Sequence, residues 1–434
     1  MSYAPYPAYK DSGVPWFDTV PEHWDVRRLK DVSRLKGGAG FPLDEQNIEG
    51  EELYFYKVGD LSLSKDGVHL DKSPHTINRK TAAKLRAEVI PKEAICYAKI
   101  GAALLLNRRR ITTADCCIDN NMTALLPNAD QLNHKYAFYW MSTVDFGEHT
   151  NPGAVPSLSE GYQSFIPIAI PPIEEQTAIA DFLDEKTTEI DDLIAKKEEL
   201  LRLLAEQRTA LITHAVTKGL NPNTSMKPSG IDWLGDVPVG WDVVPFKWCC
   251  QVQSGQVDPK LDEYKSLPLI APDHIESGTG RLLPYESAEE QGAISGKYQF
   301  DAGEVLYSKI RPELSKVALA PEAGLCSADM YAIRALKGLR PEFLFFQMLS
   351  RHFHRFAVLE SMRVAMPKIN RESLGVFPVM IPDENTQYEI LGHIETELAK
   401  MDLAEEKITT ARDHLREYRS SVITNAVTGK IKVA

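Results

Sequence analysis

The sequence predicts an α+β fold in which two mixed α/β domains are separated by two long antiparallel coiled-coil helices, with a pseudo-twofold internal repeat. Three observations predict this architecture. The chain repeats itself, each repeat closes with a long stretch of helix-forming residues, and each stretch carries a heptad pattern. We expect a first domain at 1–170, a first helix at 171–222, a second domain at 223–380 and a second helix at 381–434.

The internal repeat is clearest at the two ends of each half. Residues 10–26 match residues 227–243 without a gap, in the pattern K-x-S-G-x-x-W-x(3)-V-P-x-x-W-D-V. Residues 156–217 also match residues 367–428, whereas the middles of the halves diverge. The pattern repeats a pair of tryptophans, Trp16 with Trp24 and Trp233 with Trp241. We expect these indoles to pack in the core or at a domain edge, with a base-stacking platform as the alternative.

The long helices are predicted by composition and by period. Residues 174–217 include no Gly or Pro and are rich in Leu, Glu, Lys and Ala. Steps of four and three then define a seam, formed by Ile179, Leu183, Lys186, Ile190, Leu193, Lys197, Leu200, Leu204, Gln207, Leu211 and Ala215. The same frame in the second half gives Ile390, Ile394, Glu397, Met401, Ala404, Ile408, Ala411, Leu415, Tyr418, Val422 and Ala426. Proline precedes each stretch and glycine ends it, at Gly219 and Gly429.

Each seam needs a partner, and the other copy of the helix is the obvious one. The linker at residues 218–231 is short, so the second domain must begin near the C-terminal end of the first helix. We therefore expect the second helix to run antiparallel to the first. The N-terminal segment of the chain should then meet the end of the second helix, as residues 226 onward meet the end of the first.

Inside the domains the pattern predicts many short strands and a few helices. Strands are expected at residues 52–58, 94–100, 303–310 and 327–335, and helices rich in aromatic residues at 134–142 and 341–350. The six cysteines occur singly or as adjacent pairs, without C-x-x-C spacing. We expect them to be buried, reduced thiols rather than zinc ligands or disulfides.

The net charge of −12 argues at first against nucleic acid, which calls for a basic surface. Most of the excess acid lies in the helices, because residues 171–220 hold 11 acidic and 6 basic side chains and residues 381–434 hold 10 and 7. The two domains are therefore near neutral, which leaves room for local basic faces. No apolar run is long enough to span a bilayer and the N-terminus has no signal-peptide pattern, so we expect a cytoplasmic protein.

Catalytic signatures are mostly absent from the sequence, and the nuclease-like carboxylate-x-Lys at 263–265 lacks an upstream Pro-Asp partner. The sequence has no G-x(4)-G-K-[ST] phosphate loop, no G-x-G-x-x-G after a strand, and no Asn/Asp-Pro-Pro-aromatic corner to grip a target base. No His, Cys and Asp set has metal-ligand spacing. We therefore expect no catalytic residue, no metal site and no cofactor bound by this chain.

Basic and polar residues of the two domains are the candidates for nucleic-acid contact. Lys99 and Lys309 follow a repeated Tyr, and the Gly-rich loop at 36–40 can approach a backbone closely. Residues 151–159 and 363–370 occupy matching positions near the domain ends. Lys and Arg neutralise phosphates, while Arg, Asn and Gln can read base edges. The candidate set is Lys36, Lys99, Arg108, Arg109, Arg110, Asn151, Ser157, Lys309, Arg311, Lys316, Arg363, Lys368 and Asn370.

This combination of motifs resembles the specificity subunit of type I restriction–modification systems. The segment S-G-x-x-W-x(3)-V-P-x-x-W that opens each half is similar to the N-terminal motif of that family. The segment PIAIPPIEEQ at 167–176 is similar to the P-x-P-P-x-x-E-Q motif of that family, and the helix ending R-x(2)-L-I-T-x-A-V-T at 208–217 is similar as well. The second copy of the ending, at 419–428, has Val422 in place of Leu, and residues 382–387 lack the Glu-Gln pair.

The resemblance implies a non-catalytic subunit whose two target recognition domains each read one part of a bipartite, non-palindromic double-stranded DNA sequence. The helices would space these domains and dock two modification (methyltransferase) subunits and the restriction (helicase-nuclease) subunits. Those partners would supply S-adenosylmethionine, ATP and Mg, and would flip the target adenine. The motifs make these helix residues candidates for partner contact: Glu175, Gln176, Arg208, Thr213, Gln387, Arg419 and Thr424.

Two rival classes of function stay open on the sequence alone. A fused nuclease or methyltransferase is disfavoured because no catalytic block fits in 434 residues beside the repeats. A coiled-coil scaffold that binds only proteins is disfavoured by two large domains that have diverged separately. Neighbouring genes for an adenine methyltransferase and a helicase-nuclease would discriminate between these classes.

Overall fold

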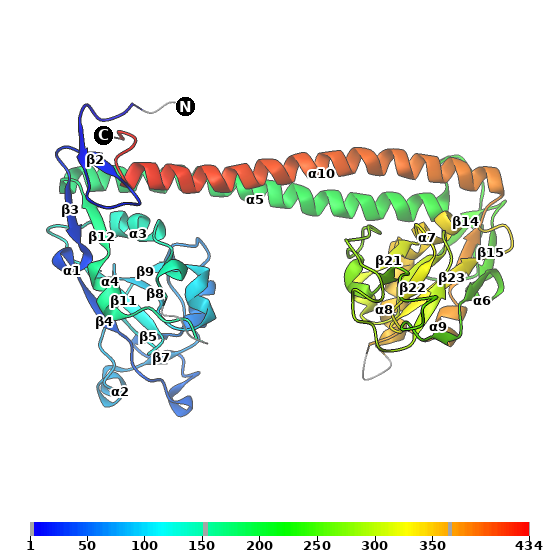
Figure 1. Cartoon of the computed structure of the whole chain (residues 1–434), viewed down its shortest axis with the longest axis horizontal. Helices are drawn as coiled ribbons and strands as arrows, with labels where there is room; N and C mark the ends of the chain where they lie inside the picture. The colour runs from blue at the N-terminus through cyan, green and yellow to red at the C-terminus, as the bar shows by residue number, and fades with distance from the viewer. Residues whose placement is uncertain (1–3, 151–154, 363–366, 434) are drawn as a thin grey trace. The chain divides into compact units, whose positions relative to one another are not determined.

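The computed structural model describes residues 4–150, 155–362 and 367–433 (Figure 1). The chain forms two compact units, one of Met1–Lys196 with Ala411–Ala434 and one of Lys197–Thr410. The long helices α5 (Ile173–Lys218) and α10 (Glu384–Val427) each contribute to both units. Both predicted helices are confirmed, while the domain boundaries at residues 170, 222 and 380 stay a prediction.

The first unit is built around two sheets. The larger sheet has the order β4-β11-β8-β9-β6, from β4 (Ser33–Gly37), β6 (His69–Leu70), β8 (Ile95–Ala98), β9 (Arg109–Thr112) and β11 (Met122–Pro127). The smaller sheet has the order β10-β5-β7, from β5 (Leu53–Tyr56), β7 (Thr76–Ile77) and β10 (Cys116–Ile118). Helix α3 (His134–Ser142) packs on the larger sheet and buries Tyr136 and Trp140 completely, and α2 (Arg79–Lys84) lies beside β7 in sequence.

The second unit repeats this plan with different strands. Its first sheet has the order β16-β23-β20-β21, from β16 (Cys250–Val252), β20 (Val305–Ser308), β21 (Val317–Leu319) and β23 (Met330–Ala335). Its second sheet has the order β17-β19-β22-β18, from β17 (Gln256–Val257), β18 (Leu269–Ile270), β19 (Lys297–Phe300) and β22 (Gly324–Cys326). Helix α7 (Pro341–Leu349) takes the place of α3, and α8 (Arg351–Ser361) follows it. The expected strands and helices within both domains are therefore confirmed.

The matching ends of the two halves form the same framework in each unit. In the first unit, hairpin β1 (Tyr9–Asp11) and β2 (Thr19–Pro21) leads to β3 (Asp25–Arg28), which pairs with β12 (Pro167–Ile170). In the second, β13 (Met226–Pro228) and β14 (Asp236–Pro238) lead to β15 (Asp242–Pro245), which pairs with β24 (Pro378–Ile381). Short helices complete the framework, α1 (Leu29–Val32) with α4 (Glu160–Phe165) and α6 (Phe246–Cys249) with α9 (Arg371–Gly375).

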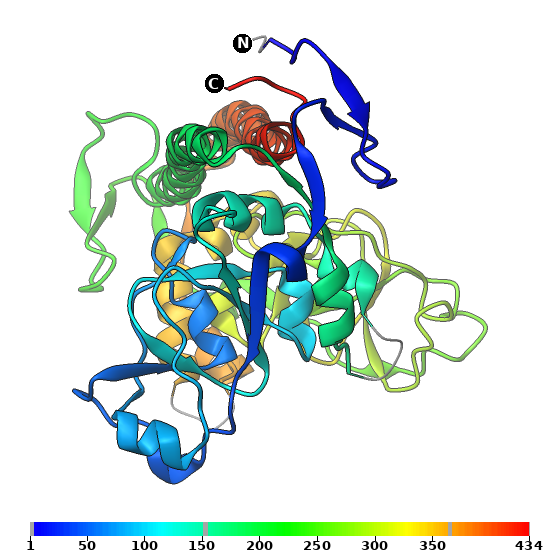
Figure 2. The ribbon, with the colours of Figure 1, turned by 90° about the vertical axis from the view of Figure 1, so that its left-hand side faces the viewer.

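The repeated tryptophans belong to this framework. Trp24 is fully buried and packs near Gly429, just past the end of α10, while Trp241 packs near Gly219 at the end of α5. In the first unit the Lys432 N–H donates to the carbonyl of Ala4 over 2.8 Å. Figure 2 shows this N-terminal segment in blue beside the red end of α10. The packing of these two indoles and the contact of the N-terminal segment with the second helix are both as predicted.

The two long helices pair in the antiparallel direction. In the first unit Arg419 of α10 donates two hydrogen bonds to the carboxylate of Asp191 of α5, over 2.8 and 3.0 Å. In the second unit Arg208 of α5 pairs with Asp402 of α10. The beginning of α5 therefore meets the end of α10, and the end of α5 meets the beginning of α10. The repeat places these ion pairs at equivalent positions.

The predicted seam of α5 is confirmed at Lys197 and Leu204, which are less exposed than their neighbours, and is wrong by one residue at the alternate positions between and around them. Leu193 and Leu200 are 45% and 46% exposed, whereas the neighbouring Ile194 and Leu201 are less exposed and Arg208 is buried. In α10 Tyr418 is likewise exposed, next to the ion-paired Arg419. At the last of these positions in each helix, Arg208 and Arg419 form the interhelical pairs with Asp402 and Asp191.

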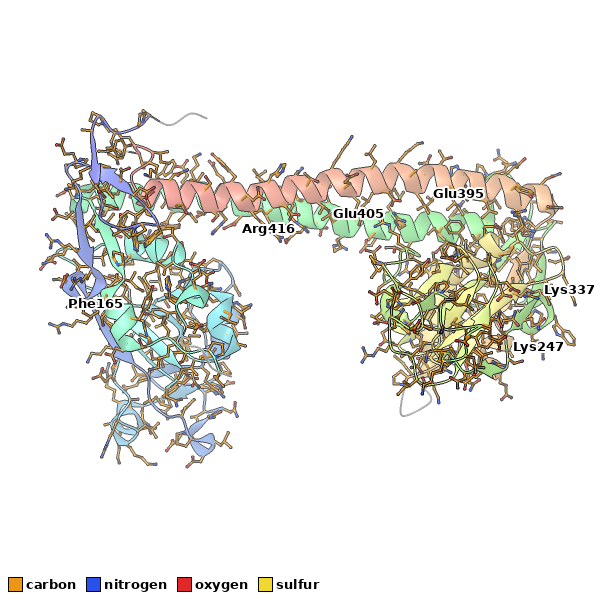
Figure 3. All side chains as sticks on the ribbon, viewed as in Figure 1. Phe165, Lys247, Lys337, Glu395, Glu405 and Arg416 are labelled. Carbon is orange, nitrogen blue, oxygen red and sulfur yellow. The ribbon has the colours of Figure 1, made fainter. Side chains whose placement is uncertain are left out.

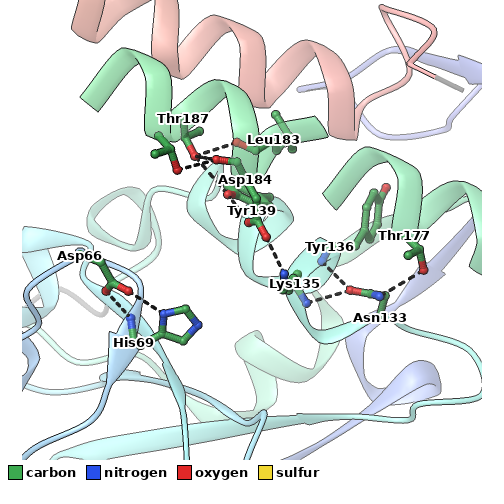
Figure 4. A network of polar contacts seen from close by, with 11 residues as sticks. Asp66, His69, Asn133, Lys135, Tyr136, Tyr139, Thr177, Leu183, Asp184 and Thr187 are labelled. Carbon is green, nitrogen blue, oxygen red and sulfur yellow. Dashed lines mark hydrogen bonds and ion pairs between the residues drawn. The ribbon is translucent and has the colours of Figure 1, made fainter. Parts of the chain in front are cut away.

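Polar contacts attach each domain to the helix pair. In the first unit Lys135 and Tyr139 of α3 reach the carboxylate of Asp184 over 2.6 and 2.7 Å (Figure 4). In the second unit Arg281 reaches the carboxylates of Asp402 and Glu405 on α10 over 2.7 and 3.0 Å. The side chains differ between the units although the framework is shared.

Candidate nucleic-acid interface

The first unit brings two separate candidate segments together at the end of β8. The Leu158 N–H donates to the carbonyl of Lys99 over 2.9 Å, and the Gly101 N–H donates to the carbonyl of Pro156 over 2.8 Å. Ser157 therefore lies opposite Ile100 in a short antiparallel bridge. This bridge, which we call the reading bridge, places Lys99 and Ser157 side by side.

The second unit builds a reading bridge of the same geometry. The Ile369 N–H donates to the carbonyl of Lys309 over 2.9 Å, and the Arg311 N–H donates to that of Pro367 over 3.2 Å. Lys368 lies opposite Ile310 and is exposed. The predicted correspondence of the two segments is confirmed for the described residues, whereas Asn151 and Arg363 lie outside them.

The reading bridge of the first unit borders a small hollow of about 170 Å³. Its wall includes Gly37, Lys99, Ser157 and Gln163. The side-chain amide of Gln163 is buried, and its oxygen accepts a hydrogen bond from the Tyr97 hydroxyl over 2.8 Å. Gly37 leaves space for the Lys99 ammonium, because a Cβ at that position would lie 3.3 Å from Lys99 Nζ.

In the second unit cations gather around Tyr331 beside the reading bridge. Lys309 Nζ lies 5.4 Å from the centroid of the Tyr331 ring, and Arg371 Cζ lies 5.7 Å from it. Arg371 also donates to the carbonyl of Gln253 over 2.6 Å. Sequence reasoning missed Arg371, although it directly follows Asn370, whose side chain caps α9 by accepting from the Ser373 N–H.

The cations at the reading bridges are available for an anionic ligand. Among the residues that the structure describes, no carboxylate oxygen lies within 4.0 Å of the nitrogens of these side chains: Lys99, Arg108, Lys309, Arg311, Lys368 and Arg371. Lys36, in contrast, pairs with Glu88 at 2.7 Å. Cations without a carboxylate partner suit the phosphates of nucleic acid, which bind by charge and counterion release.

A family model described as "Type I restriction modification DNA specificity domain" matches residues 21–202 and 238–411. The chain belongs to this family. The "Type I restriction enzyme EcoDI specificity subunit" of Escherichia coli is 31% identical over 311 residues, which cover 68% of this chain and 69% of that relative. The resemblance expected from the motifs is thus confirmed, and the two domains are DNA specificity domains.

Solved structures share the fold. A chain from a study of complex assembly and conformational transition of the type I R-M system has a TM-score of 0.70 at 13% identity, covering 95% of this chain and 99% of that one. The HsdS subunit from Thermoanaerobacter tengcongensis has a TM-score of 0.50 at 15% identity, covering 95% of this chain and 98% of that one. The expected fold of two mixed domains and long helices is therefore that of the family.

Arg109 corrects one of the DNA-contact expectations. Its side chain is buried, donates to the carbonyls of Asn107 and Val144, and lies 4.1 Å from the centroid of the Phe146 ring. Burial lowers the pKa of its guanidinium to about 10. Arg109 therefore holds the domain together, while Arg108 is exposed and Arg110 is half-buried with its pKa lowered by burial.

The Gly-rich loop is a second correction. Gly37 belongs to β4, and a Cβ on Gly38 would lie 1.8 Å from the carbonyl oxygen of Asp119. The close backbone approach that glycine permits is thus made to the chain itself rather than to DNA. In the second unit Lys316 is also engaged, since its ammonium donates to the carbonyl of Pro272 over 2.5 Å.

Two of the expected partner-contact residues are wrong. Gln176 and Gln387 are buried, and each bonds the backbone of its own unit at equivalent positions. Buried side chains cannot present a docking surface, so these glutamines belong to the framework. Glu175 is half-buried and accepts hydrogen bonds from Tyr6 and His23, and the Thr213 hydroxyl accepts from the Arg351 N–H over 2.9 Å.

The remaining expected partner-contact residues lie on the helix pair. Arg208 is buried and Arg419 is about one-third exposed, each in its interhelical ion pair. The Thr424 carbonyl accepts from the Thr428 hydroxyl within α10. Partner contact by these three residues and by Glu175 and Thr213 stays a prediction.

Over the described ranges, no group of three or more His, Cys, Asp or Glu side chains is arranged to hold a metal ion. All six cysteines are buried and free, and burial raises the pKa of the Cys96 and Cys326 thiols to about 12. No helix in the described part of the chain is long and apolar enough to cross a membrane.

Proposed function

We propose that this chain reads a bipartite, non-palindromic sequence in double-stranded DNA, with one reading bridge for each half-site. The observation that carries the proposal is that one backbone geometry is built twice with different side chains. Lys99 and Ser157 flank the first bridge, whereas Lys309, Arg311 and Lys368 flank the second. Equal scaffolds with unequal side chains suit two different half-sites, because base edges are distinguished by the donors and acceptors that meet them.

We also propose that the helix pair docks two modification subunits and the restriction subunits, which would supply all of the catalysis. S-adenosylmethionine, ATP and Mg would be bound by those partners, and the target adenine would be flipped into the methyltransferase. The support is the pseudo-symmetric pairing of Arg208 with Asp402 and Arg419 with Asp191, which offers similar helix surfaces to two copies of one partner.

Methylome sequencing of cells with and without the gene, with the partner methyltransferase present in both, tests the proposed function. We expect a two-part motif whose methylation depends on this chain. Exchanging residues 1–170 for those of another family member should change one half of the motif only. Absence of any dependent motif would leave a scaffold for proteins as the better interpretation, and a change in both halves would contradict the reading of one half-site by each domain.

Point variants test the reading bridges themselves. Lys309→Ala with Lys368→Ala should weaken binding to a duplex carrying the motif by about tenfold or more, because two phosphate or base contacts are lost. Lys36→Ala is the matched control, since its ammonium is already paired with Glu88. Equal binding by the double variant and the control would contradict the assignment of the bridges to DNA.

A further inference from the structure

An exposed aromatic ring with two cations over it lies at the end of α4, the short helix that follows the reading bridge of the first unit. Phe165, the last residue of α4, is 52% exposed. Lys30 Nζ lies 4.2 Å and Arg28 Cζ 4.9 Å from the centroid of its ring. Both cations are themselves exposed. Figure 3 marks Phe165 at the edge of this unit.

The second unit carries a similar cluster. Trp248 of α6 is 57% exposed, and the ammonium groups of Lys247 and Lys337 lie 5.6 and 5.8 Å from the centroid of its ring. Figure 3 labels the two lysines. In the internal repeat Lys247 corresponds to Lys30, and each is the second residue of its short framework helix. The aromatic ring comes from a different element in each unit, so the two clusters share one repeated lysine and differ in the ring and the second cation.

The four cations of these clusters have no carboxylate partner among the residues that the structure describes. In the described ranges no carboxylate oxygen lies within 4.0 Å of the side-chain nitrogens of Arg28, Lys30, Lys247 or Lys337. The adjacent Arg27 does form such a pair, with Asp25 at 2.9 Å. A cation on an exposed ring gains only about 0.5–1 kcal/mol and keeps N–H donors that face solvent. The clusters therefore offer charge and an apolar ring face to a ligand.

Each cluster is joined to its reading bridge by one short helix. Helix α4 begins next to Ser159 and ends at Phe165, while α9 begins next to Asn370 and ends at Gly375. A Cβ on Gly375 would lie 3.4 Å from Lys247 Cβ, so α9 ends against the second cluster. Five or six residues of helix span about 9 Å, the rise of two or three base pairs.

We propose that the two clusters, Arg28–Lys30–Phe165 and Lys247–Trp248–Lys337, bind the sugar–phosphate backbone of duplex DNA that flanks the bases read by each unit. The cations would contact phosphates and the aromatic ring would pack on deoxyribose. Such contacts add affinity without reading sequence. This inference rests on the proposed function, because it extends the DNA contact outward from the reading bridges.

Salt dependence of DNA binding tests the inference, with the chain in complex with its methyltransferase. The probes are a labelled duplex carrying the motif found by methylome sequencing and a scrambled duplex of equal length. Each phosphate contact contributes about 0.9 to the slope of log affinity against log salt. The double variants Arg28→Ala with Lys30→Ala, and Lys247→Ala with Lys337→Ala, should each reduce that slope by about 1 to 2. Both duplexes should lose affinity by a similar factor, and the methylated motif should not change.

Arg27→Ala is the matched control, because Arg27 lies on the same strand but is paired with Asp25. Trimming the duplex flank that one cluster contacts should weaken the wild-type complex. The double variant that lacks this cluster should be nearly unaffected by the same trimming. An unchanged salt slope in the double variants would overturn the inference. Loss of the complex with the methyltransferase on gel filtration would also overturn it, because the clusters would then bind an acidic protein surface. A wild-type complex that fails to distinguish the two duplexes would instead overturn the proposed function.

Discussion

Replacement of Gln176 by alanine should strongly destabilise the first unit. The Gln176 side chain is buried and joins the first turn of α5 to the loop before α3. Its oxygen accepts from the Asn133 N–H over 2.8 Å, and its nitrogen donates to the carbonyls of Gln131 and Pro171 over 2.9 Å each. Alanine leaves three backbone groups without their partner, and each loss costs about 1 kcal/mol or more. With the buried methylene surface, we expect about 4 kcal/mol.

Urea unfolding monitored by amide hydrogen exchange would measure this loss and assign it to a unit. Protection of α3 and of the beginning of α5 should fall in Gln176→Ala, while the second unit keeps its own protection. Gln387→Ala should do the reverse, because Gln387 bonds the backbone at Gly338, Arg340 and Pro382. Thr177→Ala is the control, since Thr177 is exposed. A cost below about 1 kcal/mol in Gln176→Ala would refute the framework role of its three hydrogen bonds.

Three further predictions concern single positions. Gly38→Ala should destabilise the first unit by about 3 kcal/mol in urea unfolding, because the added Cβ would overlap the Asp119 carbonyl, whereas Gly40→Ala has open space and should be near neutral. Arg208→Ala should lower the free energy of unfolding by about 2 kcal/mol and Arg419→Ala by about 1 kcal/mol, because Arg208 is the more deeply buried of the two equivalent arginines. Equal losses would contradict this reasoning. Burial lowers the pKa of His134 in the folded chain, so its contribution to stability is present above the pKa of the unfolded chain and is lost as the pH falls below that value. The pH dependence of the free energy of unfolding below about pH 6.5 should therefore be shallower in His134→Gln.

The sequence by itself determined the parts of this protein that depend on local pattern. The repeat of residues 10–26 at 227–243 predicted two copies of one framework, and the absence of Gly and Pro from 174–217 predicted a continuous helix. Capping prolines and glycines placed the helix ends within a few residues. The short linker predicted antiparallel pairing, which the pairs of Arg419 with Asp191 and Arg208 with Asp402 confirm. These features are read from neighbouring residues, and the sequence contains them directly.

Only the tertiary structure decided which polar side chains are free to meet a ligand. The run Arg108-Arg109-Arg110 reads as one basic patch in sequence, yet only the middle guanidinium is enclosed by Val144 and Phe146 from a distant loop. The reading bridges join Ile100 to Ser157 and Ile310 to Lys368 across more than fifty residues. Burial and long-range pairing depend on the path of the whole chain, because a residue's environment comes from elements that are remote in sequence.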